Sequence, residues 1–459
     1  MESMGTFTKN TAFTLIARVL NLILGMATSI IVARLLGPEG KGIYSLVILL
    51  PSFITAFTSL GIGPATVYYV ARKQYPFQEI FGNNIFLSLL IGAGSVTIGL
   101  IVVLFFQGVA FPDVPQHYLL IALALIPLTL FVGYIQNIFL GMQRVRDFNV
   151  VSLVQAALTL IFVSIALWGI RDGIVGAIIA NIVASLLVSV GLFFRTKKVA
   201  GGVSFSSNPS YLKKISTYGI KAHLSNVLAF LNYRLDILLV SGFLSPLAVG
   251  YYSVAVGIAE KLWMVSQAAS TVLFPKIAAE EDERARKEFT PIVSRTVLWL
   301  ATLGAMTIFL LSRWIVVLLY SVDYLPAVRP LQILLPGIVA LSVGRVLAND
   351  VTGRGRPMLN AYINLLVVAT NVVLNLLWLP RYGIEGAAGA STVSYIILMV
   401  GEILIYSRLS GNPPLRTLLL QRADWTLYRR LGARAVEWNK HRSTAEEEQV
   451  METSSFGRD

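Results

Sequence analysis

The sequence contains no cysteine and only three histidines among its 459 residues. Without thiols there can be no disulfide, no Cys-ligated zinc, no iron–sulfur cluster and no thiol catalysis. The three histidines, His117, His223 and His441, are far apart in the chain, which argues against a His-rich metal site. We therefore expect no metal and no other cofactor.

Charged residues are also scarce, at 13% of the chain, whereas hydrophobic residues make up 56% and the mean hydropathy is +0.72. A soluble domain has roughly a quarter charged residues. Half that fraction cannot cover the surface of a water-soluble fold of this length, so the composition predicts an all-α membrane protein. The net charge of +13 is then explained by basic cytoplasmic loops and does not call for a nucleic-acid partner.

Twelve segments are apolar over the roughly 20 residues that a membrane helix needs. They are residues 11–35, 42–65, 80–106, 116–140, 150–168, 173–194, 217–243, 249–272, 292–312, 326–347, 358–379 and 384–407. The positive-inside rule orients them. With the N-terminus inside, 25 of the 37 Lys and Arg residues fall in cytoplasmic segments and only six in outer loops. The sequence thus predicts a multi-pass protein of the cytoplasmic (inner) membrane with both termini in the cytoplasm.

The two halves of the chain repeat each other at an offset of 208 to 210 residues. Leu36, Gly37, Pro38, Gly42, Tyr44 and Ser45 correspond to Leu244, Ser245, Pro246, Gly250, Tyr252 and Ser253. Trp168, Arg171, Gly173, Ile174 and Gly176 correspond to Trp378, Arg381, Gly383, Ile384 and Gly386. Pro127 matches Pro336, which suggests matched helix kinks.

Each repeat holds six spans, an even number, so the second copy enters the membrane from the same side as the first. We expect two six-helix lobes related by a pseudo-two-fold axis along the membrane normal, with a substrate site between them. The predicted domains are residues 1–216, the first lobe with the linker; 217–410, the second lobe; and 411–459, a cytoplasmic tail. The tail is basic, and apolar residues at helical spacing favour an amphipathic helix on the inner leaflet followed by disorder.

Two motifs resemble the oligosaccharide flippases of the polysaccharide-biosynthesis (Wzx-type) family. The segment 33–44 (ARLLGPEGKGIY), continued by 60–65 (LGIGPA), is similar to the signature between the family's first two helices. In the second lobe, 234–236 (RLD), 242–244 (GFL) and 249–253 (VGYYS) resemble its seventh-helix pattern. The resemblance covers residues 5 to 410.

This resemblance implies a V-shaped transporter that flips undecaprenyl-pyrophosphate-linked oligosaccharides by alternating access, in a superfamily that includes multidrug exporters and lipid II flippases. It implies a lipid-linked oligosaccharide and membrane lipids as partners, with glycan polymerases and glycosyltransferases acting alongside. The alternatives are a cation-coupled multidrug exporter or a lipid II flippase of the same fold. A membrane glycosyltransferase or polymerase is a third, but the outer loops are short, acidic residues there are few and no DxD motif occurs, so we expect no enzyme.

Charges at membrane depth are costly, by about 3 to more than 10 kcal/mol each, and usually face a wet cavity or a partner. Arg18 lies a third of the way through the first span, and its guanidinium offers a bidentate fork to a pyrophosphate. The Arg18 segment also resembles the arginine segment of lipid II flippases, although Asn21 stands where those have glycine. The alternative is an arginine that snorkels to the cytoplasmic face.

The second lobe carries the other candidate substrate-binding residues. Arg234 and Asp236 lie at about the depth of Glu260 and Lys261 on the next helix, so two interhelical ion pairs are one interpretation. In the other, Arg234 binds phosphate or sugar while Asp236 or Glu260 titrates. Arg345, near the cytoplasmic end of the tenth span, either snorkels or binds ligand.

Neutral amides also occur within the spans. They are Asn21, Gln136, Asn137, Gln155, Asn181 and Asn371. Amides can bind sugar hydroxyls and can equally hold helices together, and we favour the second role for most of them.

Overall fold

The computed structural model describes residues 4–204, 209–264, 266–267, 269, 283–421 and 424, and within them it is built of helices. The helices are α1 (Met4–Thr58), α2 (Ile62–Ala71), α3 (Phe77–Ala110), α4 (Gln116–Ala122), α5 (Leu125–Gly141), α6 (Val145–Ser164), η1 (Ile165–Ile170), α7 (Gly173–Ala200), α8 (Pro209–Phe243), α9 (Pro246–Ala259), η2 (Glu260–Leu262), α11 (Glu283–Leu319), η3 (Val322–Ala327), α12 (Val328–Gly353), α13 (Pro357–Ser410) and η4 (Pro414–Thr417).

Nine helices in the described part of the chain are long and apolar enough to cross a membrane. The number is lower than twelve mainly because α1 and α13 each contain two predicted spans. Each turns back at a kink, α1 at Gly37 (φ 70°) and α13 at Gly383 (φ 57°), where glycine accepts a backbone conformation that other residues avoid. The predicted span 249–272 is α9 and η2, and it continues beyond the described residues. The all-α membrane fold is confirmed.

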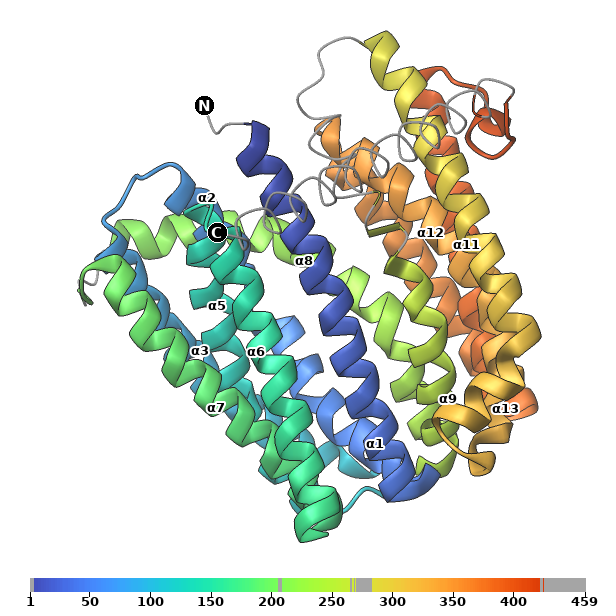
Figure 1. Ribbon diagram of the computed structural model, residues 1–459, viewed down its shortest axis with the longest axis horizontal. Helices are drawn as coiled ribbons and strands as arrows, with labels where there is room; N and C mark the ends of the chain where they lie inside the picture. Colours follow the sequence, from blue (N-terminus) through green and yellow to red (C-terminus); the bar gives the residue numbers. More distant parts are fainter. Residues whose placement is uncertain are drawn as a thin grey trace, which may run out of the picture.

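The helices form two lobes (Figure 1). One contains α1 to α7 and the other α9 to α13, and the lobes diverge toward the end of the molecule where α1 begins. Helix α8 runs from the first lobe to the second. Near its start, Tyr218 stacks on Tyr68 of α2 with ring centroids 4.5 Å apart, whereas its later part packs along α13.

The lobes touch through a reciprocal backbone contact where α1 turns and α9 begins. A Cβ atom on Gly42 would lie 1.7 Å from the carbonyl oxygen of Pro246, and one on Gly250 would lie 1.9 Å from that of Pro38. These four residues are two repeat-related pairs, so each lobe offers the other the same surface, as in an isologous two-fold contact. Only glycine leaves room for the two backbones to approach this closely.

The repeat extends to other details of the structure. The hydroxyl oxygens of Ser45 and Ser253, a repeat-related pair, lie 3.4 Å apart, so the pseudo-two-fold axis passes between them. Gly173 (φ 62°) and Gly383 (φ 57°), another such pair, share the left-handed backbone conformation. The expected pseudo-two-fold relation between the lobes is therefore present.

The two prolines that match in the repeat lie in different local settings. A break at Leu123 and Ala124 separates α4 from α5, and Pro127, which has no N–H to donate to the Leu123 carbonyl, lies just after it. The repeat-related Pro336 lies inside the continuous helix α12.

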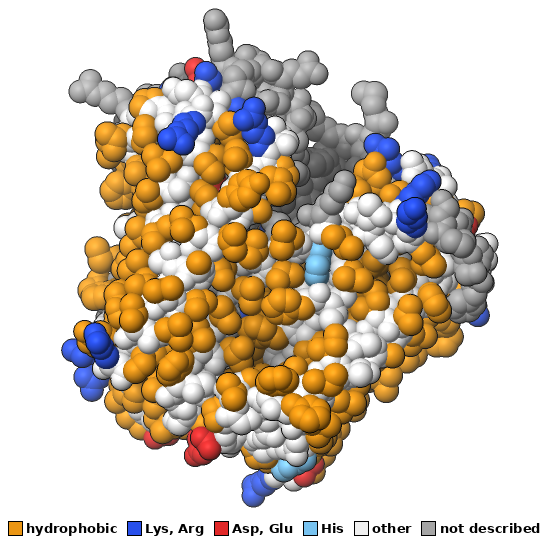
Figure 2. All heavy atoms as spheres, turned by 180° about the vertical axis from the view of Figure 1, so that it is seen from behind, with side chains coloured by type: hydrophobic (Ala, Val, Ile, Leu, Met, Phe, Trp, Pro, Cys, Tyr) orange, Lys and Arg blue, Asp and Glu red, His pale blue; other side chains and the backbone are white. Residues whose placement is uncertain are grey.

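The outer surface suits a lipid environment. Figure 2 shows hydrophobic side chains over the middle of one face, with most charged ones near its two ends. Large apolar side chains point outward, including Phe105 at 76% and Trp314 at 75% exposure. An apolar outer surface of this kind is typical of a multi-pass membrane protein.

The contact on the axis gives a first prediction. In this cysteine-free chain, the double variant Ser45→Cys/Ser253→Cys should form a cross-link on mild oxidation, because the two hydroxyls are 3.4 Å apart. Maleimide-polyethylene glycol labelling after denaturation would then count no free thiols. The control pair Ser45→Cys/Thr97→Cys, in which Thr97 is on the exposed face of α3, should stay reduced. Two free thiols in the first variant would show that the lobes do not meet at these serines.

Candidate functional site

One face of the first half of α1 carries a row of polar residues. Arg18, Asn21 and Ser29 are spaced three and eight residues apart, which places them on one side of the helix. Arg18 donates to the backbone carbonyl of Gln267 at 3.4 Å, and Asn21 is half-buried one turn further on. Because Gln267 follows η2 in the second lobe, Arg18 lies between the lobes.

Lys41 lies at the other end of this row, and the sequence analysis missed it as a candidate. Its ammonium donates to Ser29 at 3.2 Å, and the side chain is only 8% exposed. It is also close enough to Lys261 of η2 for the two charges to repel each other. Position and charge alone suggest an outer-loop lysine, but its repeat partner Val249 is apolar, which was the available sign that this position faces inward.

Arg234 of α8 and Glu260 of η2 form a bidentate ion pair, with N–O distances of 2.9 and 3.3 Å. One interpretation of the sequence placed two interhelical ion pairs at this depth; this pair forms, whereas Asp236 accepts its hydrogen bonds from Tyr252, Ile237 and Ser391. The arginine side chain remains one-third exposed, so it is accessible to a further anionic group. Lys261 is close enough to interact with the charges of both residues.

Arg345 of α12 lies against two aromatic rings. Its guanidinium carbon is 4.0 Å from the ring centroid of Trp263 and 4.6 Å from that of Tyr233, and its Nε donates to the Tyr233 hydroxyl at 3.2 Å. Cation–π contacts hold a guanidinium in place while leaving its other N–H groups free to bind. Arg345 thus joins Arg234 and Lys261 on one side of the second lobe.

Asp236 has a different environment. Its carboxylate is buried and accepts hydrogen bonds from the Tyr252 hydroxyl at 2.6 Å, the Ile237 backbone N–H at 2.8 Å and the Ser391 hydroxyl at 3.3 Å. These contacts connect α8, α9 and α13. The first lobe has a counterpart at the repeat-related positions, where Asn181 donates to the Tyr44 hydroxyl at 2.7 Å.

Together these residues form the inter-lobe cationic site, which we define as Arg18, Lys41, Arg234, Lys261 and Arg345. Its carboxylates are Glu260, paired with Arg234, and the enclosed Asp236. The excess of cations makes this region electropositive. Inside a low-dielectric bundle such an excess attracts an anionic group more strongly than it would in water.

Several amides connect helices, as favoured from the sequence. Gln136 donates to the Ser152 hydroxyl at 2.8 Å and Gln155 to that of Ser185 at 3.2 Å, which link α5 to α6 and α6 to α7. Asn371 donates to Ser391 at 3.4 Å between the two parts of α13.

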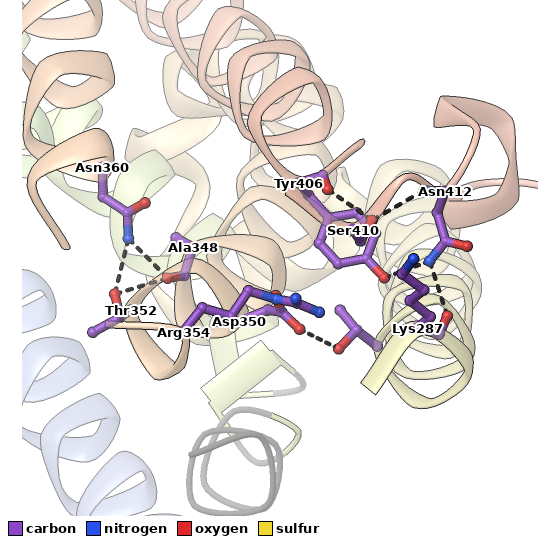
Figure 3. A network of polar contacts seen from close by, with 10 residues as sticks. Lys287, Ala348, Asp350, Thr352, Arg354, Asn360, Tyr406, Ser410 and Asn412 are labelled. Carbon is purple, nitrogen blue, oxygen red and sulfur yellow. Dashed lines mark hydrogen bonds and ion pairs between the residues drawn. The ribbon is translucent and has the colours of Figure 1, made fainter. Parts of the chain in front are cut away.

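A separate polar network holds the ends of α11, α12 and α13 together (Figure 3). Asp350 is fully buried, binds Arg354 and accepts a hydrogen bond from Thr290 at 2.5 Å. Asn412 donates to the Tyr406 hydroxyl and to the Lys287 carbonyl, both at 2.9 Å. This network is structural and distinct from the inter-lobe cationic site.

A buried ion pair ties the segment after α13 to this end of the second lobe. Arg295 of α11 donates to Asp424 at 2.6 Å and to the Arg416 carbonyl at 2.5 Å, and both charged side chains are at most 2% exposed. The described start of the predicted amphipathic segment is the short 3-10 helix η4. Residues 422, 423 and 425 onward lie outside the described residues.

The family model described as polysaccharide biosynthesis protein matches residues 7–281. The chain belongs to this family. The resemblance found in its motifs is thereby confirmed, and a second model, MatE, matches residues 222–377.

Curated relatives of this family member match across much of its length. A putative O-antigen transporter of Shigella flexneri is 23% identical and covers 87% of this chain and 98% of its own. A probable low-salt glycan biosynthesis flippase, Agl15 of Haloferax volcanii, is 22% identical over 40% of this chain and 43% of its own.

Solved structures share the fold. The lipid II flippase MurJ in an inward closed conformation gives a TM-score of 0.72 at 17% identity, over 88% of both chains. An inward-facing multidrug resistance transporter of the MATE family gives 0.73 at 15% identity, over 85% of this chain and 94% of that one. At these identities the likeness establishes the two-lobed fold.

The surroundings of Asp236 yield a second prediction. Asp236→Asn should lower the free energy of unfolding by about 1–3 kcal/mol, because the new NH₂ group would face donors where an acceptor is required. Thermal unfolding in detergent measures the loss. Glu385→Gln is the control: its side chain is 41% exposed and its 3.8 Å ion pair with Arg329 lies on the surface, so the loss should stay below about 1 kcal/mol. Equal losses for the two variants would contradict a structural role for Asp236.

Proposed function

We propose that this protein flips lipid-linked oligosaccharides across the cytoplasmic membrane for the biosynthesis of a surface polysaccharide. The carrier is a polyprenyl pyrophosphate, and the lobes provide alternating access. The observation that carries the proposal is the inter-lobe cationic site, which matches an anionic head group within the membrane. Family membership and the names of the relatives from Shigella flexneri and Haloferax volcanii support it.

In this mechanism the pyrophosphate binds between the lobes. Arg18 offers its guanidinium from the first lobe, while Arg234, Lys261 and Arg345 approach from the second. Since both lobes contribute cations, a bound anion draws them together and offsets the repulsion between the positive charges. Release on the other side requires the Gly42–Gly250 contact to open, which rocks one lobe against the other.

A multidrug exporter of the same fold is the rival function. Exporters of the superfamily that the motifs resemble commonly use an acidic residue inside the first lobe, yet the six spans of this chain's first lobe have no Asp or Glu in their interiors. The charged residues that the first lobe contributes to the site are Arg18 and Lys41. A lipid II flippase would also bind a polyprenyl pyrophosphate, so only the sugar distinguishes it. Neither an oligosaccharide flippase nor a lipid II flippase changes the covalent structure of its substrate, and we propose no enzymatic activity.

Arg18 provides the most direct test. Losing a charge-assisted phosphate contact costs about 1.5–3 kcal/mol, which is roughly 10- to 150-fold in affinity. Arg18→Ala should therefore abolish most flipping of a fluorescent lipid-linked oligosaccharide in proteoliposomes. Arg18→Lys should restore only part, because an ammonium does not form the bidentate fork.

The control is Arg381→Ala, which removes an exposed arginine at the kink in α13. It should transport at the wild-type rate, and all three variants should insert in equal amounts. Normal transport by Arg18→Ala would show that this arginine only snorkels and would move the phosphate contact to Arg234 or Arg345.

The orientation is part of the proposal and gives a fourth prediction. The bias in Lys and Arg places both termini in the cytoplasm, so loading occurs from the side on which α1 begins. A reporter fused after Asp459 that is active only in the cytoplasm should be active. Activity of a reporter that works only outside would reverse the direction of loading.

A further inference from the structure

A pocket of about 410 Å³ opens in the first lobe, apart from the inter-lobe cationic site. It lies between α1, α2, α5 and α8, and its size is within the range of about 300–1,000 Å³ typical of small-molecule sites. None of the residues that line it is charged. Ser52, Thr55, Tyr134, Asn137 and Asn226 bring hydroxyl and amide groups to its wall.

Most of these groups have already used their hydrogen-bond donors within the protein. Ser52 and Thr55 donate to the carbonyls one turn earlier at 3.0 and 2.8 Å, and Asn137 donates to that of Gly133 at 2.5 Å. Tyr134 donates to the Ser59 carbonyl at 2.9 Å. Each hydroxyl oxygen and amide carbonyl keeps acceptor capacity. The pocket therefore suits a neutral ligand rich in donors, and a sugar with its hydroxyl groups is such a ligand.

An aromatic ring completes the wall. Phe230 of α8 lines the pocket and is held edge-to-face against Phe53 of α1, with ring centroids 5.0 Å apart. The C–H groups on one face of a pyranose ring pack well on such a surface. Helix α8 is fixed over the pocket where it crosses α2, because a Cβ on Gly61 would lie 2.2 Å from the Gly219 carbonyl oxygen.

The same helix connects the pocket to the cationic site. Asn226, Phe230 and Arg234 follow one another at intervals of four residues, so they lie along one side of α8. With a rise of about 1.5 Å per residue, Asn226 and Arg234 are about 12 Å apart along the axis. In a polyprenyl pyrophosphate glycan the first sugar is attached directly to the phosphate, so a phosphate at Arg234 would place the following sugars toward the pocket.

We propose that this pocket binds the sugar part of the substrate while the inter-lobe cationic site holds the pyrophosphate. The inference rests on the proposed function and adds a second subsite to it. Asn226 supplies a donor and an acceptor, the hydroxyls of Ser52 and Thr55 accept, and Phe230 packs against a ring face. Selection among glycans takes place here, in a neutral pocket, and is separate from recognition of the carrier.

The test compares two lipids on the full-length protein in nanodiscs. One is bare polyprenyl pyrophosphate, and the other is the same lipid carrying a single glucose, galactose or N-acetylglucosamine. The wild type should bind at least one sugar-bearing lipid about tenfold more tightly than the bare lipid, as expected for one or two hydrogen bonds. Asn226→Ala and Phe230→Leu should each reduce this ratio toward one without changing the affinity for the bare lipid.

Two controls separate the subsites. Thr217→Ala, which removes an exposed hydroxyl elsewhere on α8, should leave both affinities unchanged. Arg234→Gln should lower the affinity for both lipids by the same factor. Retained binding of the bare lipid also shows that the pocket variants are folded.

The inference is overturned if the wild type does not distinguish any of the sugars from the bare lipid, or if Asn226→Ala keeps the wild-type ratio. Sodium-dependent thermal stabilisation that is lost in Asn226→Ala, with the ratio unchanged, would assign the pocket to a cation instead. Failure of the wild type to bind either lipid would reject the proposed function itself, an outcome distinct from the loss of sugar discrimination alone.

Discussion

The architecture depends on the contact of two backbones on the pseudo-two-fold axis. Gly42 and Gly250 let each helix approach the carbonyl oxygen of its partner's proline without a side chain between them. Such an interface has no long side chains to interdigitate, so it can separate without repacking a core. This contact sets the position of one lobe relative to the other. It therefore also places the cations of α1 opposite those of α8 and α12.

The charged residues within the bundle fall into two groups that differ in burial. Asp236, Arg295 and Asp350 are enclosed, and each is held by hydrogen bonds or ion pairs from neighbouring helices or segments, which is how a helical bundle tolerates a charge at depth. Arg234 and Arg345 are instead held through an ion pair or by aromatic rings, and both side chains are only partly buried. The first group stabilises the fold, and the second offers capacity for an anion.

Much of this could be predicted from the sequence, because hydropathy and an internal repeat are properties of the chain itself. The spans and the pseudo-symmetry were predictable from hydropathy and spacing. Equal depth suggested ion pairs among Arg234, Asp236, Glu260 and Lys261, but not that Arg234 would pair with Glu260 while Asp236 is enclosed by Tyr252 and Ser391. The inward position of Lys41 and the pocket beneath α8 were not predictable either. Both depend on how a helix turns after a kink or crosses another helix, and that geometry is set by contacts between residues more than 10 positions apart, such as Lys41 with Ser29.

The buried pair of Arg295 and Asp424 has a consequence for how the chain can be shortened. Proteolytic trimming that removes Asp424 would leave a guanidinium enclosed in α11 without its counter-ion, and losing one partner of a buried pair costs about 3–5 kcal/mol. A shortened chain that keeps this ion pair must therefore extend at least to residue 424, beyond the end of α13.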